Sequence, residues 1–399
     1  MPVNVLSHIP QLPKLPKDET PSASGQEQRL KVLETQGVTF EYLSGRRHIE
    51  DPAVFRGHIE NFIGLAQVPV GVVGPLCVRG EHADGAFYVP MATTEGALVA
   101  SYNRGAKLVT MSGGARVVCL SDRVSRAPGF LFADVFEAKT FADWCVARRE
   151  TFQTVTRTVT RHGHLEELRT TVLGNHVYLT LEFTTGDAAG QNTATFATDA
   201  ICRHIIEHAP VRPRHWFIES NLSGDKKATA ISFLLGRGKN VTTEVVVPRE
   251  LVIRELGTTA DMVMEYSKMS VIAGARSGSI GVQGHYANAL AAIFIACGQD
   301  AACVAEASVG ITRVDLTGNG DLYVSVSLPN LIVGTVGGGT DLPTQRECLS
   351  MMGCAGEGTA KKFAEICAAC VLAGEISITA AIAAGHFAQA HRAYGRKKA

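Results

Sequence analysis

Two stretches rich in glycine and other small residues, 60–126 and 225 onward, are separated by a stretch of different character at 127–218. The flanking stretches have the pattern of short strands and buried helices joined by close backbone turns, in keeping with 40 glycines among 399 residues. The stretch between them combines helix and strand patterns of ordinary composition. This arrangement predicts a mixed α/β (α+β) chain in which a small domain is inserted into a larger one.

The local patterns also predict individual elements. Pro10, Pro13, Pro16 and Pro21 prevent a continuous helix, so we expect a disordered arm over 1–26 that includes a flexible segment at 22–25. Apolar spacing predicts helices at 26–35, 93–109, 148–160, 193–208, 249–266, 286–296 and 356–394. Alternating or continuous apolar runs predict strands at 67–74, 167–173, 177–183, 241–247 and 322–328, then a strand and glycine loop at 332–340.

Charge and hydropathy exclude several classes of protein. Lys plus Arg and Asp plus Glu number 38 each, so no net field attracts nucleic acid or an anionic membrane. No apolar run reaches the ~18 residues that a membrane span needs, and the longest, 366–385, is interrupted by Glu375. The first ten residues lack the apolar core of a signal peptide. We expect a cytoplasmic protein without nucleic-acid or membrane partners.

The cysteines and histidines do not predict a metal site. The ten cysteines lack the spacing of a disulfide framework and are expected to stay reduced. Cys367 and Cys370 form a CxxC inside an apolar helical stretch, where core packing is favoured over metal or redox work. His386 and His391 are five residues apart on the expected final helix, so they point about 140° apart and do not make a zinc pair.

Two segments carry groups suited to binding negative charge. The loop 184–192 joins a strand to a helix and can aim backbone N–H groups at a phosphate, although Asn192 as a helix cap is the simpler interpretation. Asp225, Lys226 and Lys227 form a charged cluster in which an acid could hold a lysine against a developing oxyanion. Neighbouring side chains of an extended segment point opposite ways, so one lysine should face the site. The alternative is a solvated charged turn.

Asp300 and Glu95 each have a structural and a catalytic interpretation. Asp300 follows a helix that Gly298 can end, and it either caps the next helix or takes part in chemistry. Glu95 lies at the expected start of an apolar helix, where a raised pKa would let it donate a proton at neutral pH. Complementing the helix dipole is the other explanation for Glu95.

Taken in order, these segments resemble the HMG-CoA reductase family over roughly residues 60–399. The motifs that carry the resemblance are 60–64 with 68–71, Thr-Thr-Glu-Gly within 91–101, Asp-Lys-Lys at 225–227, Gly-Gln-Asp at 298–300, the glycine loop 334–340 and Ala-Ala-Gly-His at 383–386. The Thr-Thr-Glu-Gly form resembles class I, which includes the eukaryotic catalytic domains, without their membrane-anchor region. The resemblance implies four-electron reduction of HMG-CoA to mevalonate and CoA with two NADPH.

The resemblance also implies roles for individual residues. The catalytic set is Glu95, Lys226, Asp300 and His391. The substrate-binding set, for HMG and for coenzyme A, is Arg126, Asp225, Lys227, Lys268, Asn288, Ser101, Asn103 and Arg104. The cofactor-binding set is Thr160, Arg161, Gly186, Asp187, Ala188, Gly190, Gln191 and Asn192. Arg161, with help from Arg157, would bind the 2′-phosphate and favour NADPH over NADH, unless these arginines form only a solvated helix end.

Some positions depart from the family pattern. Ala189 and Gln191 replace the two methionines of the cofactor loop, Glu219 replaces a substrate-contacting serine, and Ala390 replaces the serine before His391.

The implied architecture has three parts: an N-terminal arm and small helical segment at 1–59, a large substrate-binding domain at 60–126 plus 219–399, and an inserted ferredoxin-like NADP-binding domain at 127–218. It also implies a homodimer or homotetramer with active sites at the subunit interface. The alternative is a catalytically silent family member with a binding or regulatory role.

Overall fold

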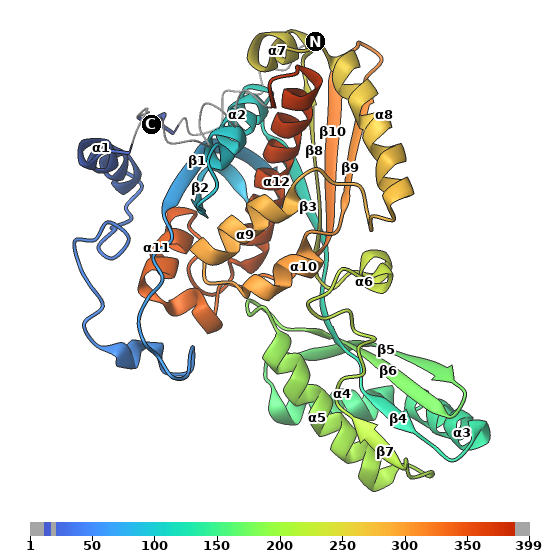
Figure 1. Ribbon diagram of the computed structural model, residues 1–399. Helices are drawn as coiled ribbons and strands as arrows, with labels where there is room; N and C mark the ends of the chain where they lie inside the picture. Colours follow the sequence, from blue (N-terminus) through green and yellow to red (C-terminus); the bar gives the residue numbers. More distant parts are fainter. Residues whose placement is uncertain (1–11, 17–20, 388–399) are drawn as a thin grey trace.

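The computed structural model describes residues 12–16 and 21–387 and has the mixed α/β architecture expected from the sequence. Figure 1 shows a large body of strands and helices above and a smaller body, with α3, α4 and α5, below. Hydrogen bonding runs continuously between the two through β3 (Ala115–Arg126). The last three residues of β3 pair with β6 (His176–Thr184) of the smaller body, and its earlier part pairs with β8 (Gly238–Val247) of the larger one.

The large sheet is built mainly from antiparallel neighbours. β8 pairs with β3 on one side and with β10 (Leu322–Leu331) on the other, and β9 (Ile311–Leu316) forms the edge. β1 (Val70–Gly80) forms a hairpin with β2 (Asp84–Ala92) and pairs in parallel with β3. Side chains alternate between buried and partly exposed along β8 and β10, as expected for strands with one face against a core.

The central helix α12 (Ala360–Ala383) packs against β3, β8, β10 and α2 (Leu98–Met111). By length and composition this helix could cross a membrane, but 83% of its most apolar window is buried inside the protein. Cys367 and Cys370 are both 0% exposed within it, which confirms core packing as their role. A helix that is apolar all round is therefore explained here by burial on every side.

The smaller body has an antiparallel sheet in the order β5–β6–β4–β7. Its aromatic core includes Phe130, Phe141 and Phe152, all at most 2% exposed. The bounds are β4 Gly129–Leu131, β5 His164–Leu173, β7 His215–Phe217, α3 Val135–Val146, α4 Arg149–Val159 and α5 Gln191–His208.

The remaining elements surround the large sheet. They are α1 Ala23–Glu34, η2 Pro52–Phe55, α6 Ala230–Leu235, α7 Arg249–Leu256, α8 Ala260–Ser277, α9 Tyr286–Ala296, η3 Ala301–Cys303, α10 Val304–Ala307, η4 Gly338–Asp341 and α11 Pro343–Met351.

Several predicted boundaries were wrong. The expected helix 249–266 is two helices, because Gly257 ends α7 at φ 67° and Thr259 caps α8. The expected helix 93–109 begins only at Leu98, after Ala97 at φ 71°. The expected final helix ends at Ala383, and Gly385 follows with φ 71°. The segment 22–25, expected to be flexible, forms the N-cap and first turn of α1.

Candidate active site

A cavity of about 1640 Å³ opens beside α2, α9 and α12. It gathers residues from segments far apart in the sequence, which the tertiary fold alone brings together. The residues of the expected site that line it are Glu95, Ser101, Asn103, Arg104 and Asn288. Its other polar lining residues include Lys14, Arg29, Lys107, His285 and Glu375.

Glu95 lies in the turn before α2, so it is not a residue of the helix itself. Its backbone N–H is donated to Thr93 Oγ1 over 3.0 Å, which fixes the turn. The Glu95 side chain is exposed, and its Oε2 accepts a hydrogen bond of 2.8 Å from Asn288 Nδ2 on α9. Two members of the expected site, one catalytic and one substrate-binding, are thus in direct contact.

The expected coenzyme A residues are held by the helices α2 and α12. Arg104 donates to the Ser377 carbonyl oxygen over 2.8 Å, and Ser101 Oγ lies 3.0 Å from Ser377 Oγ. Asn103 accepts the Gly74 N–H over 3.0 Å, which joins α2 to β1. These contacts fix the side chains along one wall of the cavity.

Glu375 and His285 form a polar pair in the cavity that the sequence analysis did not identify. The Glu375 carboxylate, 2% exposed, accepts N–H bonds of 2.7 Å from both Gly284 and His285, and lies 3.0 Å from His285 Nδ1. Burial raises the pKa of Glu375, but these hydrogen bonds and that of Thr312 outweigh burial and lower it. A lone acid in an apolar helix was the available sequence signal.

A second cluster contains Lys226 and Asp300. Lys226 Nζ lies 2.8 Å from Asp300 Oδ2, and this hydrogen bond raises the pKa of Lys226 above its ordinary value. Asp300 also accepts the Ala302 N–H over 3.0 Å at the start of η3. Asp300 therefore caps η3, as one interpretation of the sequence predicted, and also binds Lys226.

The neighbours of Lys226 form a dense charge network. Arg126 Nη1 lies 2.7 Å from Asp225 Oδ2 and 3.6 Å from Glu219 Oε2. Burial raises the pKa of Asp225, but Arg237 and Arg126 outweigh it and hold the pKa below its ordinary value. Glu219, noted in the sequence as a departure from the family pattern, thus faces the same arginine as Asp225.

The two lysines of this cluster point to different partners. Lys227 Nζ donates to the Asp225 carbonyl oxygen over 3.0 Å, whereas Lys226 reaches Asp300. The backbone is not extended at this point, because Lys226 has φ 56° in the left-handed region. Only Lys226 of the two lysines contacts Asp300. The expectation that one lysine faces the site is met, but the cause is the left-handed backbone at Lys226 and not the alternation of an extended strand.

The expected cofactor loop docks on the large domain through Asp187. Its carboxylate accepts N–H bonds from Gly358 (2.7 Å) and Ala360 (3.1 Å), which caps the N-terminus of α12. The Asp187 carbonyl oxygen also accepts the Thr335 N–H over 2.8 Å. The close approach requires glycine at 334, where a Cβ would lie 2.3 Å from Ala189 N.

The N-terminus of α5 has no side-chain cap. Its N-cap, Gly190, has φ 88° and gives no side-chain hydrogen bond to the first turn. A Cβ at Gly190 would lie 2.2 Å from Thr185 Oγ1, so a larger residue does not fit. Asn192 is exposed and does not cap the helix, so that simpler interpretation was wrong.

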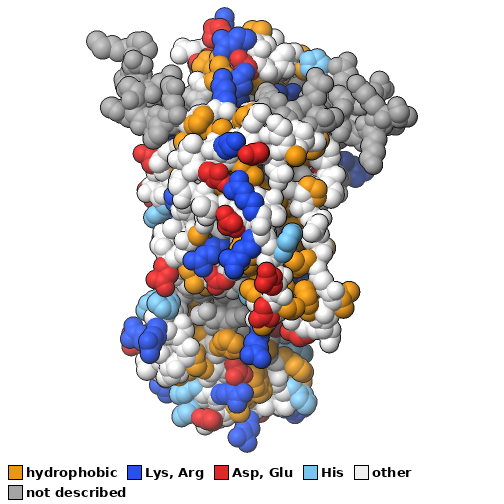
Figure 2. Space-filling model, turned by 90° about the vertical axis from the view of Figure 1, so that its left-hand side faces the viewer, with side chains coloured by type: hydrophobic (Ala, Val, Ile, Leu, Met, Phe, Trp, Pro, Cys, Tyr) orange, Lys and Arg blue, Asp and Glu red, His pale blue; other side chains and the backbone are white. Residues whose placement is uncertain are grey.

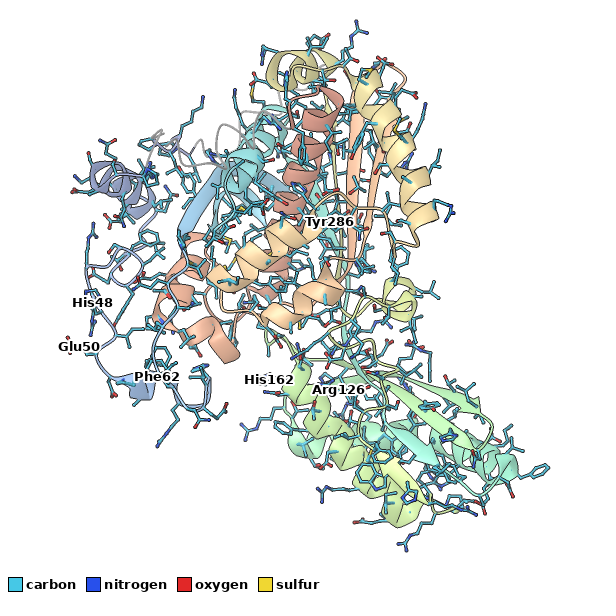
Figure 3. All side chains as sticks on the ribbon, viewed as in Figure 1. His48, Glu50, Phe62, Arg126, His162 and Tyr286 are labelled. Atoms are coloured by element: carbon cyan, nitrogen blue, oxygen red, sulfur yellow. The ribbon has the colours of Figure 1, made fainter. Side chains whose placement is uncertain are left out.

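The two sides of this loop lie next to segments that carry other expected site residues. Gln191 donates to Cys303 Sγ over 2.7 Å, three residues after Asp300. On the other side, a Cβ placed on Gly186 would lie 3.9 Å from the Cβ of His162, and Thr160 Oγ1 accepts the Gly163 N–H over 3.0 Å. The exposed Arg161 therefore belongs to a turn beside the loop. His162 and Arg126 both lie at the end of the inserted domain nearest the large domain (Figure 3).

Lys268 and His386 do not join either cluster. Lys268 is exposed on α8 and pairs with Glu265 at 2.6 Å. His386 is exposed after the end of α12 and lies beside Gly257. His391 lies outside the described residues.

The Glu95 and Lys226 clusters lie at opposite ends of α9. Asn288, which binds Glu95, is in the first turn of this helix, and Asp300 follows its last turn. At 1.5 Å of rise per residue, the ends of an 11-residue helix are about 16 Å apart. Lys226 and Asp300 are not among the described residues that line the cavity.

Figure 2 shows basic and acidic side chains interspersed on one face, in agreement with the balanced composition.

Comparison with known proteins gives a consistent family. The protein-family model described as hydroxymethylglutaryl-coenzyme A reductase matches residues 25–396 of this chain. The 3-hydroxy-3-methylglutaryl-coenzyme A reductase of Pyrococcus abyssi is 46% identical over 376 residues, covering 92% of each chain. That of Aeropyrum pernix is 49% identical over 345 residues, covering 85% of this chain and 82% of the other.

A solved class II enzyme from Streptococcus pneumoniae, bound to NADPH in open conformations, has a similar fold. It gives a TM-score of 0.72 at 18% identity and covers 89% of this chain and 96% of that chain. The expected membership of class I is not supported by this comparison. At this identity the likeness concerns the fold alone.

Proposed function

This chain belongs to the hydroxymethylglutaryl-coenzyme A reductase family, and on that premise we propose how its residues divide the work of the reaction. It is an oxidoreductase that reduces HMG-CoA to mevalonate and releases CoA. The observation that carries our proposal is the 2.8 Å contact between Lys226 Nζ and Asp300 Oδ2, next to the loop 186–192.

Lys226 stabilises the oxyanion that forms when the thioester carbonyl is reduced. A preorganised cation at such a position contributes about 10²–10³ in rate. Asp300 holds the ammonium in place. Arg126 and Lys227 supply positive charge for the HMG carboxylate, and Asp225, whose carboxylate holds Arg126, completes the substrate-binding set. The charge network thus serves both binding and chemistry.

Two groups manage the protons. His391 protonates the departing CoA thiolate, for which an imidazolium is a competent acid because a thiol has a pKa of roughly 8.5. Glu95, oriented by Asn288, supplies the proton for the second reduction. The coenzyme A portion lies along Ser101, Asn103 and Arg104 in the cavity.

We propose NADPH as the cofactor, which supplies the hydrides when bound. The first turn of α5, open at Gly190, suits a pyrophosphate. Arg161 in the adjacent turn suits a 2′-phosphate, because a guanidinium binds phosphate oxygens in pairs. The Asp187 carboxylate already accepts hydrogen bonds at the N-terminus of α12. It is therefore not free to bind the ribose hydroxyls of NADH, and no other carboxylate lies in this loop. The NADPH-bound relative from Streptococcus pneumoniae supports the same choice.

A complete site requires two subunits in this proposal. Lys226 and Asp300 lie one length of α9 away from Glu95 within a protomer. A homodimer, or a homotetramer built from such dimers, would join the Lys226 cluster of one protomer to the Glu95 cavity of its partner. We propose a cytoplasmic enzyme, since all ten cysteines are free thiols.

The test is oxidation of NADPH and of NADH by the purified chain in the presence of HMG-CoA, with other acyl-CoA thioesters as controls. We expect two NADPH consumed per mevalonate and a lower KM for NADPH than for NADH. Absence of HMG-CoA-dependent oxidation with either cofactor would instead favour a silent binding or regulatory member of the family.

A further inference from the structure

Arg237 and Glu306 form an ion pair hidden from solvent next to the turn that carries Lys226. Both side chains are 0% exposed. Arg237 Nη1 lies 2.7 Å from each Glu306 carboxylate oxygen, and its Nη2 lies 3.0 Å from Asp225 Oδ1. Neither residue was expected from the sequence to belong to the site, and neither lines the cavity.

Glu306 also holds the Lys226 backbone. Its Oε1 accepts the Lys226 N–H over 3.2 Å, in addition to the bond from Arg237. Lys226 has φ 56°, a conformation that side-chain-bearing residues adopt only when the surrounding structure imposes it. The carboxylate of Glu306 is a contact that can impose this conformation.

Lys226 is therefore held at two points by one short stretch of chain. Asp300 binds its ammonium, and Glu306, on α10, binds its backbone. The two acids are joined by η3 and the first turn of α10 without an intervening loop. Precise placement of a charged group needs such support, because a displacement of ~1 Å costs about 10²-fold in rate.

We propose that Arg237 and Glu306 are positioning residues for the reduction, which fix the backbone of Lys226 so that its ammonium meets Asp300 and the substrate oxyanion. This inference rests on the catalytic role proposed for Lys226. The competing explanation is that the pair only stabilises the fold. Buried ion pairs are often replaceable by apolar side chains without loss of stability, which allows the two explanations to be separated.

The experiment compares Glu306→Gln with the double variant Arg237→Met/Glu306→Leu. The single change leaves a buried arginine without its full counter-charge, so both Tm and kcat should fall. The double change removes both charges of the pair and leaves Asp225 with Arg126 as its arginine partner, so Tm should recover toward wild type while kcat stays about ten- to hundred-fold low. The KM for HMG-CoA should change less than kcat. Recovery of kcat together with Tm would overturn the proposal.

Two controls make the result decisive. Glu365→Gln alters another 0% exposed carboxylate, which accepts N–H bonds from His82 and Ala83 away from Lys226, and should keep wild-type kcat. If the double variant does not fold, kcat of Glu306→Gln is compared with kcat of Glu365→Gln at a temperature below the Tm of both variants. Equal kcat values overturn the proposal. Lys226→Ala is measured in parallel: normal turnover there refutes the role of Lys226 itself, which is a separate failure.

Discussion

In this protein, the role of a single residue depends on the groups that it contacts more than on its chemical type. Lys226 and Lys227 are adjacent and both exposed, yet one reaches Asp300 and the other a backbone carbonyl oxygen. Asp187 has the chemistry of a ribose ligand, but its carboxylate caps α12. A residue's role at this scale follows from the group that it contacts.

Lys226→Ala should lower kcat by about 100-fold or more, because the oxyanion loses its cation. HMG-CoA should still bind, since Arg126 and Asp225 remain paired. Steady-state kinetics with a separate binding measurement checks this. The neighbouring Lys227→Ala is the matched control and should raise KM more than it lowers kcat. Near-wild-type turnover of Lys226→Ala would refute the assignment.

Arg161→Ala should raise the KM for NADPH by about ten-fold or more and leave that for NADH nearly unchanged. A charge-assisted hydrogen bond contributes ~1.5–3 kcal/mol, and ~1.4 kcal/mol corresponds to ten-fold. The control is Arg203→Ala, which removes an exposed arginine of α5 paired with Asp199. Equal effects on the two cofactors would contradict a 2′-phosphate role.

At the scale of elements, the N-termini of helices connect segments that are distant in the sequence. The N-terminus of α12 is capped by a residue of the inserted domain, and the N-terminus of α9 contacts Glu375 in the middle of α12. Free N–H groups at a helix start need acceptors, and here carboxylates from distant segments supply them. Each such contact fixes one element against another.

Asp187→Asn should raise the KM for NADPH roughly five-fold, because weakening a cap costs about 1 kcal/mol and releases the loop. Asp134→Asn is the matched control: Asp134 caps α3 in the same domain and accepts N–H bonds from Phe136 and Glu137. Its stability loss should be similar, without an effect on NADPH. The two variants are compared by thermal unfolding and by cofactor titration, and an equal rise in KM for both would refute the loop-docking role.

Glu375→Gln should lower the free energy of unfolding by about 2 kcal/mol at neutral pH, the scale of hydrogen bonds to a buried charge. The pKa of Glu375 is lowered from 4.5 in the folded protein, so the ionised form stabilises the fold above that pH. As pH falls below about 4.5 this contribution is lost, and the difference between variant and wild type should shrink. Denaturant unfolding from pH 7 to pH 3.5 measures it, and a constant difference would contradict the linkage.

At the scale of the whole molecule, the separation of the two clusters is the basis of our proposal that a site needs two chains. Glu95 and Lys226 belong to opposite ends of α9 within one protomer. Exposed apolar side chains such as Ile63 (102%) and Leu65 (59%) remain on the described surface. An assembly of identical chains would account for both observations.

Glu95→Ala and Lys226→Ala chains, each inactive alone, should recover activity when mixed. Random exchange makes half of the dimers mixed, and each mixed dimer has one intact site of two, so about a quarter of wild-type activity is expected. Exchange is verified by a tag on one chain before the assay. No recovery after complete exchange would mean that both residues serve a site within one chain.

The sequence by itself determined the features that depend on neighbouring residues. The helix expected at 148–160 is α4 (Arg149–Val159), and the strand expected at 322–328 lies within β10, because periodic side-chain patterns are local. The order of motifs also determined the family, as the comparisons show.

The tertiary structure alone decided which distant groups meet. Asp187 caps a helix that begins 173 residues further along the chain. Arg237, just before β8, and Glu306, on α10, are 69 residues apart and form a fully buried ion pair only in the folded protein. Such contacts leave no local pattern, since either residue has the same sequence neighbours whether it is buried or solvated. The physical reason is that hydrogen bonds and ion pairs between distant segments become favourable only after the core has brought those segments together.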